Sequence, residues 1–212
     1  MSTLKATHRE FLSALCVSVV RSIKELPVEV IDAIFTRQSI QTLRPDPVRR
    51  ELVERLLAAA VQAPNHYRVR PWRFVVLQGQ ARERLGDVFA ENARAAHPDA
   101  PPATLDKERA KALRSPLLIA VGVDTPADPR VVEVENISAA AAAVENLLLA
   151  APALGLAAKW RTGDTAYDPR VKAFLGFQPD QHIVAFLYIG FPEGETAPVE
   201  RPSFEDRTVW ME

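Results

Sequence analysis

Three short segments of this sequence combine side chains that bind anions with side chains that contact planar rings. The first, Arg37-Gln38-Ser39, lies at the end of an expected helix. The planar guanidinium of Arg37 could form paired hydrogen bonds with a phosphate, and the Ser39 hydroxyl could add another. The alternative is structural, because an arginine near a helix C-terminus is favoured by the helix dipole. Taken alone, this segment favours the structural interpretation.

The second segment is Gln62-Ala63-Pro64-Asn65-His66, which comes shortly before Pro71-Trp72. It places an amide and an imidazole at the end of a helix and in the loop that follows, where both could reach a ligand. Taken singly, a histidine such as His66 is more typical of a surface loop, and Trp72 is more typical of a core position. This segment therefore indicates a ligand site only in combination with the other two segments.

The third segment is Trp160-Arg161-Thr162-Gly163, which lies at the end of an expected strand. Ligands often bind just beyond strand ends. An aromatic ring, a cation, a hydroxyl group and an unhindered backbone could together contact a flavin. A strand that simply ends in a solvated arginine explains the same residues, and both interpretations stay open at this point.

Other common signatures of catalysis are missing from the sequence. It contains neither the Gly-x-Gly-x-x-Gly dinucleotide fingerprint nor a Gly-x-x-x-x-Gly-Lys phosphate loop. No group of cysteines and histidines has metal-ligand spacing, and no Gly-x-Ser-x-Gly elbow occurs. We therefore expect no metal site and no side-chain nucleophile. If the protein is an enzyme, a bound cofactor supplies the chemistry.

In this order, the three segments resemble the FMN-dependent nitroreductase family. The resemblance is greatest to its small bacterial branch, which carries a Trp-Arg-Ser/Thr-Gly motif. It runs from about Val28 to Pro192. The family's Arg-Arg-Ser motif reads Arg37-Gln38-Ser39, and its Ala-Pro-(Asp/Asn)-His loop with a following Pro-Trp reads Ala63-Pro64-Asn65-His66 and Pro71-Trp72. An alanine-rich helix before Gly155-Leu156 and the run Phe186–Pro192 also match.

This resemblance implies an α+β fold, in which a central mixed or antiparallel sheet is flanked by helices. It also implies an intertwined homodimer with two FMN sites at its interface. By position, Arg37, Gln38 and Ser39 would hold the FMN phosphate and ribityl chain. Gln62 and His66 would approach from the partner subunit, and Trp160, Arg161 and Thr162 would line the flavin. Gln38 replaces a usual arginine, and Arg161 or Arg201 could supply the missing cation.

The implied reaction passes reducing equivalents from NADH or NADPH through bound FMN to a nitroaromatic or quinone-like acceptor. One open flavin face would serve both small-molecule substrates in turn, which gives a ping-pong mechanism. Two other interpretations stay open. The protein could bind or sequester FMN without turnover, or it could be a structural protein that has lost the flavin.

The hydrophobic pattern predicts one domain over residues 27–212, after an N-terminal extension at residues 1–26. Apolar runs predict strands, of which the last reads as central because it shows no polar alternation. The expected strands are Trp72–Leu77, Leu117–Val123, Leu156–Trp160 and Ile183–Ile189. The expected helices begin after Pro27, before Leu52 and at Asp168-Pro169, and cover Ala81–Ala95, Thr104–Leu113 and Glu135–Leu154.

Composition narrows the cellular context. The 26 basic and 27 acidic side chains leave a net charge of −1, which argues against a dedicated nucleic-acid binder. The single cysteine, Cys16, fits a reducing compartment, and we expect a cytoplasmic protein. No uninterrupted apolar run of about 18 residues predicts a membrane span. The helix Glu135–Leu154 is apolar almost all round, and the tail carries Trp210, so we expect both to pack against a second copy.

Overall fold

A single four-stranded antiparallel sheet organises the protein. The computed structural model describes residues 28–194 and 197–212, so the expected extension at residues 1–26 lies outside the described residues. The strand order is β1-β2-β4-β3, and every neighbouring pair is antiparallel. This confirms the α+β class and the antiparallel form of the predicted sheet. The strands are β1 (Trp72–Gln78), β2 (Leu117–Val123), β3 (Ala157–Arg161) and β4 (His182–Gly190).

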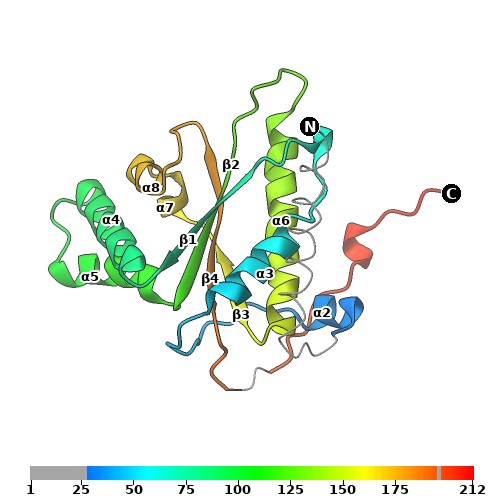
Figure 1. Ribbon diagram of the computed structural model, residues 1–212, viewed down its shortest axis with the longest axis horizontal. Helices are drawn as coiled ribbons and strands as arrows, with labels where there is room; N and C mark the ends of the chain where they lie inside the picture. The colour runs from blue at the N-terminus through cyan, green and yellow to red at the C-terminus, as the bar shows by residue number, and fades with distance from the viewer. Residues whose placement is uncertain (1–27, 195–196) are drawn as a thin grey trace, which may run out of the picture.

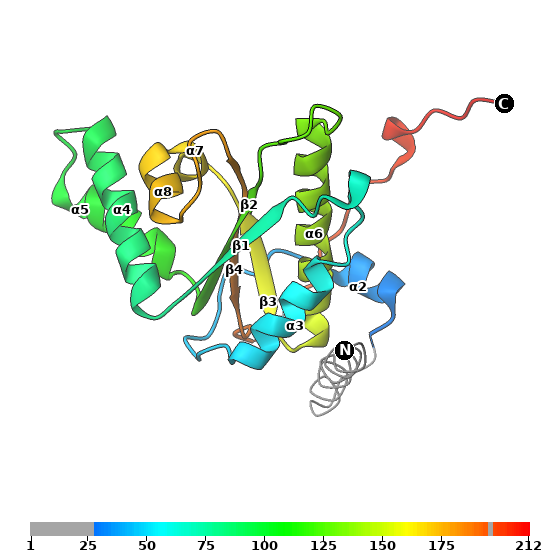
Figure 2. The ribbon, with the colours of Figure 1, turned by 45° about the horizontal axis from the view of Figure 1, so that its top comes forward.

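Helices cover both faces of this sheet, as Figures 1 and 2 show. One face is covered by α6 (Glu133–Ala153), with α3 (Arg50–Ala60) beside it and α2 (Val30–Thr36) against its outer side. The other face carries α4 (Gln80–Ala96), α5 (Pro102–Ala110), η3 (Lys111–Leu113), α7 (Asp164–Tyr167) and α8 (Pro169–Phe174). Two short helices, η2 (His66–Arg68) and η4 (Glu205–Arg207), lie in loops. The sheet is therefore the middle of three layers.

The long helix α6 forms the core of the first face. Ala140, Val144 and Leu147 are completely buried against the sheet, because small and medium side chains let the helix approach closely. By length and composition, α6 is the one helix among the described residues that could cross a membrane. Its buried inner side shows instead the packing of a core helix.

The opposite core forms between β2, β4 and the helices α4 and α8. Phe89 and Phe186 meet edge to face, with ring centroids 6.0 Å apart. Gly122 is needed on β2, since a Cβ atom there would lie 2.3 Å from the Phe177 ring. The predicted cap of α8 also forms, because Asp168 Oδ1 accepts hydrogen bonds from two backbone N–H groups of that helix.

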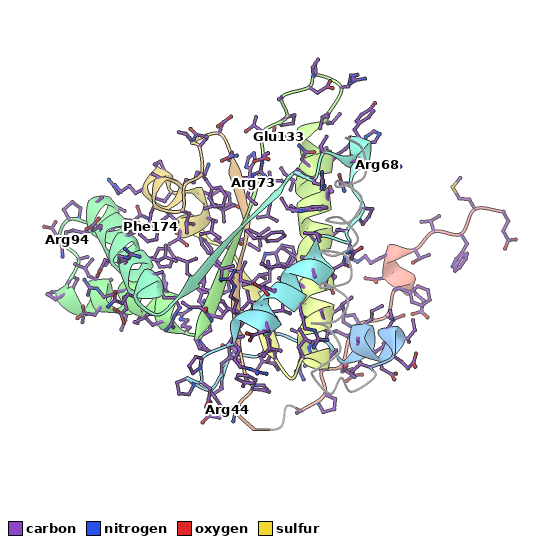
Figure 3. All side chains as sticks on the ribbon, in the orientation of Figure 1. Arg44, Arg68, Arg73, Arg94, Glu133 and Phe174 are labelled. Carbon is purple, nitrogen blue, oxygen red and sulfur yellow. The ribbon has the colours of Figure 1, made fainter. Side chains whose placement is uncertain are left out.

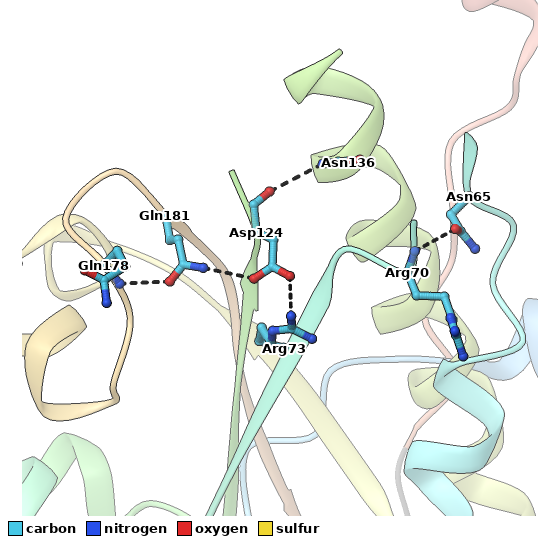
Figure 4. Close-up of polar contacts among 7 residues, drawn as sticks. All are labelled: Asn65, Arg70, Arg73, Asp124, Asn136, Gln178 and Gln181. Carbon is cyan, nitrogen blue, oxygen red and sulfur yellow. Dashed lines mark hydrogen bonds and ion pairs between the residues drawn. The ribbon is translucent and has the colours of Figure 1, made fainter. Parts of the chain in front are cut away.

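A polar network holds the end of the sheet where loop 65–71 enters β1 (Figure 4). The Asp124 carboxylate, which follows β2, lies 2.6 Å from Arg73 Nη2 and accepts a 2.9 Å hydrogen bond from Gln181 Nε2. The Asp124 carbonyl accepts a 3.4 Å bond from the Asn136 side chain on α6. One residue thereby joins β1, β2, the chain before β4 and α6.

Two regions differ from the pattern of a self-contained domain. The helix expected after Pro27 forms as α2, yet Phe35 is 77% exposed and Ile31 is 62% exposed, and Ala33 is the helix's one buried residue. The tail was expected to pack through Trp210, but this side chain is 81% exposed within one chain. No segment among residues 28–194 and 197–212 therefore covers the apolar surface of these two regions.

Candidate functional site

Arg37 and Gln38 lie at the start of the edge strand β3. They line a pocket of about 510 Å³ together with residues from the end of α6, the start of β3 and the segment after β4. Arg37 Nε lies 3.7 Å from Glu145 Oε1, a loose ion pair between a partly buried guanidinium and an exposed carboxylate. Ser39 follows on the exposed surface and does not line this pocket.

The chain after β4 returns to this same place. The Gln38 side-chain amide donates a 3.1 Å hydrogen bond to the Ala197 carbonyl, and Arg201 Nη2 donates a 3.2 Å bond to the Arg37 carbonyl. The structure thus brings the guanidinium of Arg201 beside Arg37, although 164 residues separate them in sequence. Arg201 is one of the two residues that we expected to supply the positive charge missing at Gln38.

The chain after Gln38 covers the first part of the free edge of β3. Ile40 N donates to the Ala158 carbonyl over 3.4 Å, after which the segment pairs with residues 191–193 through Arg44 N and Glu193 N. Among the described residues, no further main-chain hydrogen bond reaches this outer edge. The backbone of β3 beyond Ala158 is therefore open to a ligand.

The Trp160-Arg161-Thr162-Gly163 segment ends this open edge. Trp160 packs on the α6 side of the sheet, and its indole N–H donates a 3.0 Å hydrogen bond to the Val184 carbonyl. Arg161 and Thr162 line a second pocket, of about 340 Å³, on the α4–α5 side. Gly163 has φ +104°, a conformation that other residues rarely adopt, which lets the chain turn from β3 into α7.

Positive charge gathers on this side of β3. Burial lowers the pKa of the Lys159 ammonium, and the neighbouring guanidiniums of Arg161 and Arg114 lower it further. Burial also raises the pKa of the Tyr188 hydroxyl, against the opposing effect of the same two arginines. This pocket is also lined by Lys111 and Arg114, which the sequence analysis missed. Neither residue belongs to a motif, and both reach the pocket only through folding.

The loop with His66 lies elsewhere, at the N-terminal half of α6, and Gln62 precedes it at the end of α3. Gln62 Nε2 donates to the Ala58 carbonyl of its own helix, and His66 Nδ1 lies 2.7 Å from Glu135 Oε2. The His66 ring stacks on Tyr67, with centroids 4.1 Å apart. Tyr67, Arg68 and Arg70 all have positive φ, and Asn65 Oδ1 steadies this loop by accepting from Arg70 N, as Figure 4 shows.

A single subunit therefore assembles only part of the expected site. Glu135, beside His66, and Glu145, beside Arg37, are ten residues apart on α6, which is about 15 Å along the axis. Arg37, Gln38, Trp160, Arg161 and Thr162 gather along β3, whereas His66 lies near the other end of α6. Trp72, which follows the His66 loop, is buried in the core.

Comparison with known proteins identifies the family of this chain. The model of the nitroreductase family matches residues 34–191. The Escherichia coli protein "Putative NAD(P)H nitroreductase YdjA" is 31% identical over 166 residues, which cover 78% of this chain and 90% of the relative. The chain belongs to the nitroreductase family.

Solved structures support the same fold for this nitroreductase-family protein. A nitroreductase-like protein from Bacillus cereus matches with a TM-score of 0.74 and 26% identity, covering 90% of this chain and all of that one. A Desulfovibrio desulfuricans structure in complex with FMN is 28% identical, with a TM-score of 0.65, and covers 84% of this chain and 94% of that one. The predicted family and its fold are both confirmed, and the protein is an oxidoreductase of this family.

Proposed function

We propose that this protein binds FMN along the open edge of β3 and passes electrons from NADH or NADPH through it to nitroaromatic or quinone-like acceptors. One observation carries the proposal. The pair Arg37 and Arg201 stands at one end of this edge, and the Arg161–Gly163 backbone stands at the other. A ligand with a phosphate at one end and a hydrogen-bonding ring at the other matches both ends.

The residues present fit FMN in length and in chemistry. A strand of five residues spans about 17 Å, which is comparable with an extended flavin mononucleotide. Two guanidiniums can hold a phosphate dianion through charge-assisted hydrogen bonds. At the other end, unpaired backbone groups can bond the polar edge of the ring, and Gly163 adds no side chain to obstruct it.

The cofactor is FMN, and the electron donor is NADH or NADPH. The bound FMN of the 28%-identical structure and the NAD(P)H in the name of the 31%-identical relative support this assignment. When bound, FMN would supply the redox chemistry that links the oxidation of the donor to the reduction of the acceptor. The choice between NADH and NADPH is left open by the residues on this edge.

The protein's own residues bind and orient rather than react. Arg37 and Ser39 hold the phosphate and ribityl chain, while Gln38 fixes the returning segment that carries Arg201. Trp160 fixes the sheet side of the site through its bond to Val184. Arg161 and Thr162 face the ring end, where cations stabilise the negative charge of the reduced state.

We further propose a homodimer in which each FMN site is shared. The exposed side chains Val30, Ile31, Ile34 and Phe35 of α2, with Val134 of α6, leave an apolar surface that a second copy would cover. The exposed tail with Trp210 would then lie on the partner. In such a dimer Gln62 and His66 approach the FMN of the other subunit, and this accounts for the distance of His66 from β3 within one subunit.

The test of this function uses the purified full chain. Titration with FMN, followed by flavin fluorescence, should saturate, and NADH or NADPH should then bleach the flavin absorbance rapidly in a stopped-flow experiment. Saturable binding without bleaching would support the alternative of an FMN-binding protein without turnover. A protein that stays colourless after FMN reconstitution would support the third interpretation, a structural protein without flavin.

The order of substrates has its own test. A single open flavin face cannot hold donor and acceptor together, so initial rates at varied donor and acceptor concentrations should give parallel double-reciprocal lines. Intersecting lines would exclude a ping-pong mechanism. The reducing cytoplasm, expected from the single cysteine, is the proposed place of action.

A further inference from the structure

The pocket on the α4–α5 side of β3 has walls of unlike character. The wall formed by α4 and its C-terminus has an apolar part, Phe89, Ala93 and Ala96, beside the polar side chains of Asn92 and His97. The facing wall carries Arg161 and, from the chain before β2, Arg114. Its volume of about 340 Å³ lies within the range of small-molecule sites, at the size of a compact single-ring compound.

Tyr188, a mostly buried residue, contributes to the lining of this pocket. Tyr188 of β4 is only 6% exposed, and it pairs directly across the sheet with Lys159 of β3 and Leu118 of β2. Its ring packs in the α4–α8 core, yet its hydroxyl forms no hydrogen bond with any described residue, and it contributes to the pocket lining. Because most of this side chain is buried while Tyr188 lines the pocket, its hydroxyl is available as a donor to a ligand bound there.

The charges around the hydroxyl favour an anion as that ligand. Lys111 is paired with Glu108, whereas Arg114 and Arg161 form no ion pair with any described carboxylate. Asp164, the remaining acid of the pocket lining, is not paired with either arginine. Lys159 stands beside them on the same face of β3, and the pKa of its ammonium is lowered by burial and then by both arginines. These cations repel each other without a bound anion.

We propose that this pocket binds the carboxylate or phosphate group of a small aromatic acceptor, held by Arg114, Arg161 and the Tyr188 hydroxyl. The apolar part of the α4 wall would take the ring, and the guanidiniums and the hydroxyl would take the anionic oxygens. This inference rests on the proposed function, because Arg161 also begins the segment assigned to the ring end of FMN. It narrows the acceptor to anionic aromatic compounds.

Direct binding tests the pocket without turnover. We expect calorimetric titration of the FMN-loaded protein with benzoate to show saturable binding, and the neutral analogue benzyl alcohol to bind much more weakly. Arg114→Gln should weaken benzoate binding by about ten- to hundredfold, the usual effect of losing a hydrogen bond between charged groups. Tyr188→Phe, which keeps the ring and removes only the donor, should weaken it by about tenfold.

The matched control is Arg94→Gln. Arg94 is an exposed arginine of α4 that does not line the pocket, and Figure 3 shows it on the outer side of that helix. The change removes the same charge from the same region, so it should leave benzoate affinity within about twofold. Equal weakening by Arg94→Gln and Arg114→Gln would show a general charge effect and would overturn the proposal.

Kinetics separate this inference from the proposed function. The wild-type protein should reduce 4-nitrobenzoate with a lower KM than nitrobenzene, and Arg114→Gln should remove that difference by raising the KM for 4-nitrobenzoate alone. Reduction of both acceptors with equal KM would overturn the anion site and leave the proposed function standing. Benzoate binding without reduction of either acceptor would support the anion site and contradict the proposed function. Benzoate binding to the FMN-free protein alone would assign the pocket to the cofactor and overturn the inference.

Discussion

Large apolar residues are buried in the interior of the sheet but exposed on the outer surface of α2. Both are rich in large apolar residues. In the interior, β2 is buried along its whole length and Phe186 of β4 is 1% exposed. On α2, Phe35 and Ile31 point into solvent. The apolar residues of the interior are buried within one chain, whereas those of α2 and of the tail are exposed among the described residues.

The buried cores stabilise the subunit, whereas the proposed shared site also depends on residues at the subunit surface. The core around α6 and the core around α4 each close on the sheet, and together they fix β3 in place. The residues along β3 are positioned by those cores. The residues expected from the partner, Gln62 and His66, lie at the surface of the subunit. Substitutions in the two regions should therefore have different consequences.

The largest effect should come from the interior. Phe186→Ala removes a buried ring that meets Phe89 edge to face, and it should lower the free energy of unfolding by about 3–5 kcal/mol. Urea unfolding followed by circular dichroism measures this change. A loss well below 1 kcal/mol would contradict the assignment of Phe186 to a tightly packed core.

A smaller but specific effect should come from the phosphate end of the site. Arg37→Ala should weaken FMN binding by about ten- to hundredfold, which corresponds to the loss of a hydrogen bond to a charged group. Arg49→Ala is the matched control, since Arg49 is an exposed residue that lies outside both pockets along β3. Equal FMN affinities in the two variants would refute the role of Arg37.

The surface of α2 should affect assembly rather than folding. If α2 packs on a second copy, Phe35→Ala should weaken dimer formation by about tenfold or more, because a phenyl ring then loses its burial in the interface. Sedimentation velocity over a range of protein concentrations measures the shift. Phe174→Ala, on α8 at the opposite side of the sheet, is the control and should leave the dimer intact (Figure 3). A monomeric wild-type protein would defeat the prediction outright.

The smallest expected effect concerns the fraction of FMN sites that bind normally in a mixed dimer, which tests whether each site is shared between subunits. Mixed dimers of Arg37→Ala and His66→Ala chains should bind FMN normally in about half of their sites, because one site collects both lesions and the other keeps neither. The two homodimers, measured alongside, should bind weakly at every site. If both residues served the same subunit's site, every site of the mixed dimer would carry one lesion, and no recovery would appear.

Much of the local structure could be predicted from the sequence because its physical causes are local. The unbroken apolar run at Leu117–Val123 predicted a buried strand, and β2 has these same bounds. Asp168 followed by proline predicted the cap of α8, since the carboxylate and the proline ring each act within one helical turn. The expected helix Thr104–Leu113 instead divides into α5 and η3, a boundary that the apolar pattern does not encode.

The sequence predicts the segments of the site, but it does not predict which of their side chains lie together. By itself the sequence determined all four strands and most of the helices, the family resemblance, and the three segments along which FMN is expected. Only the tertiary structure decided that Arg201 returns to Arg37, that Arg114 and Tyr188 face Arg161, and that His66 lies away from all of them. The physical reason is distance along the chain. A cap or a strand depends on neighbours a few residues away, whereas these groupings arise when two packed cores bring remote segments to the ends of one edge strand.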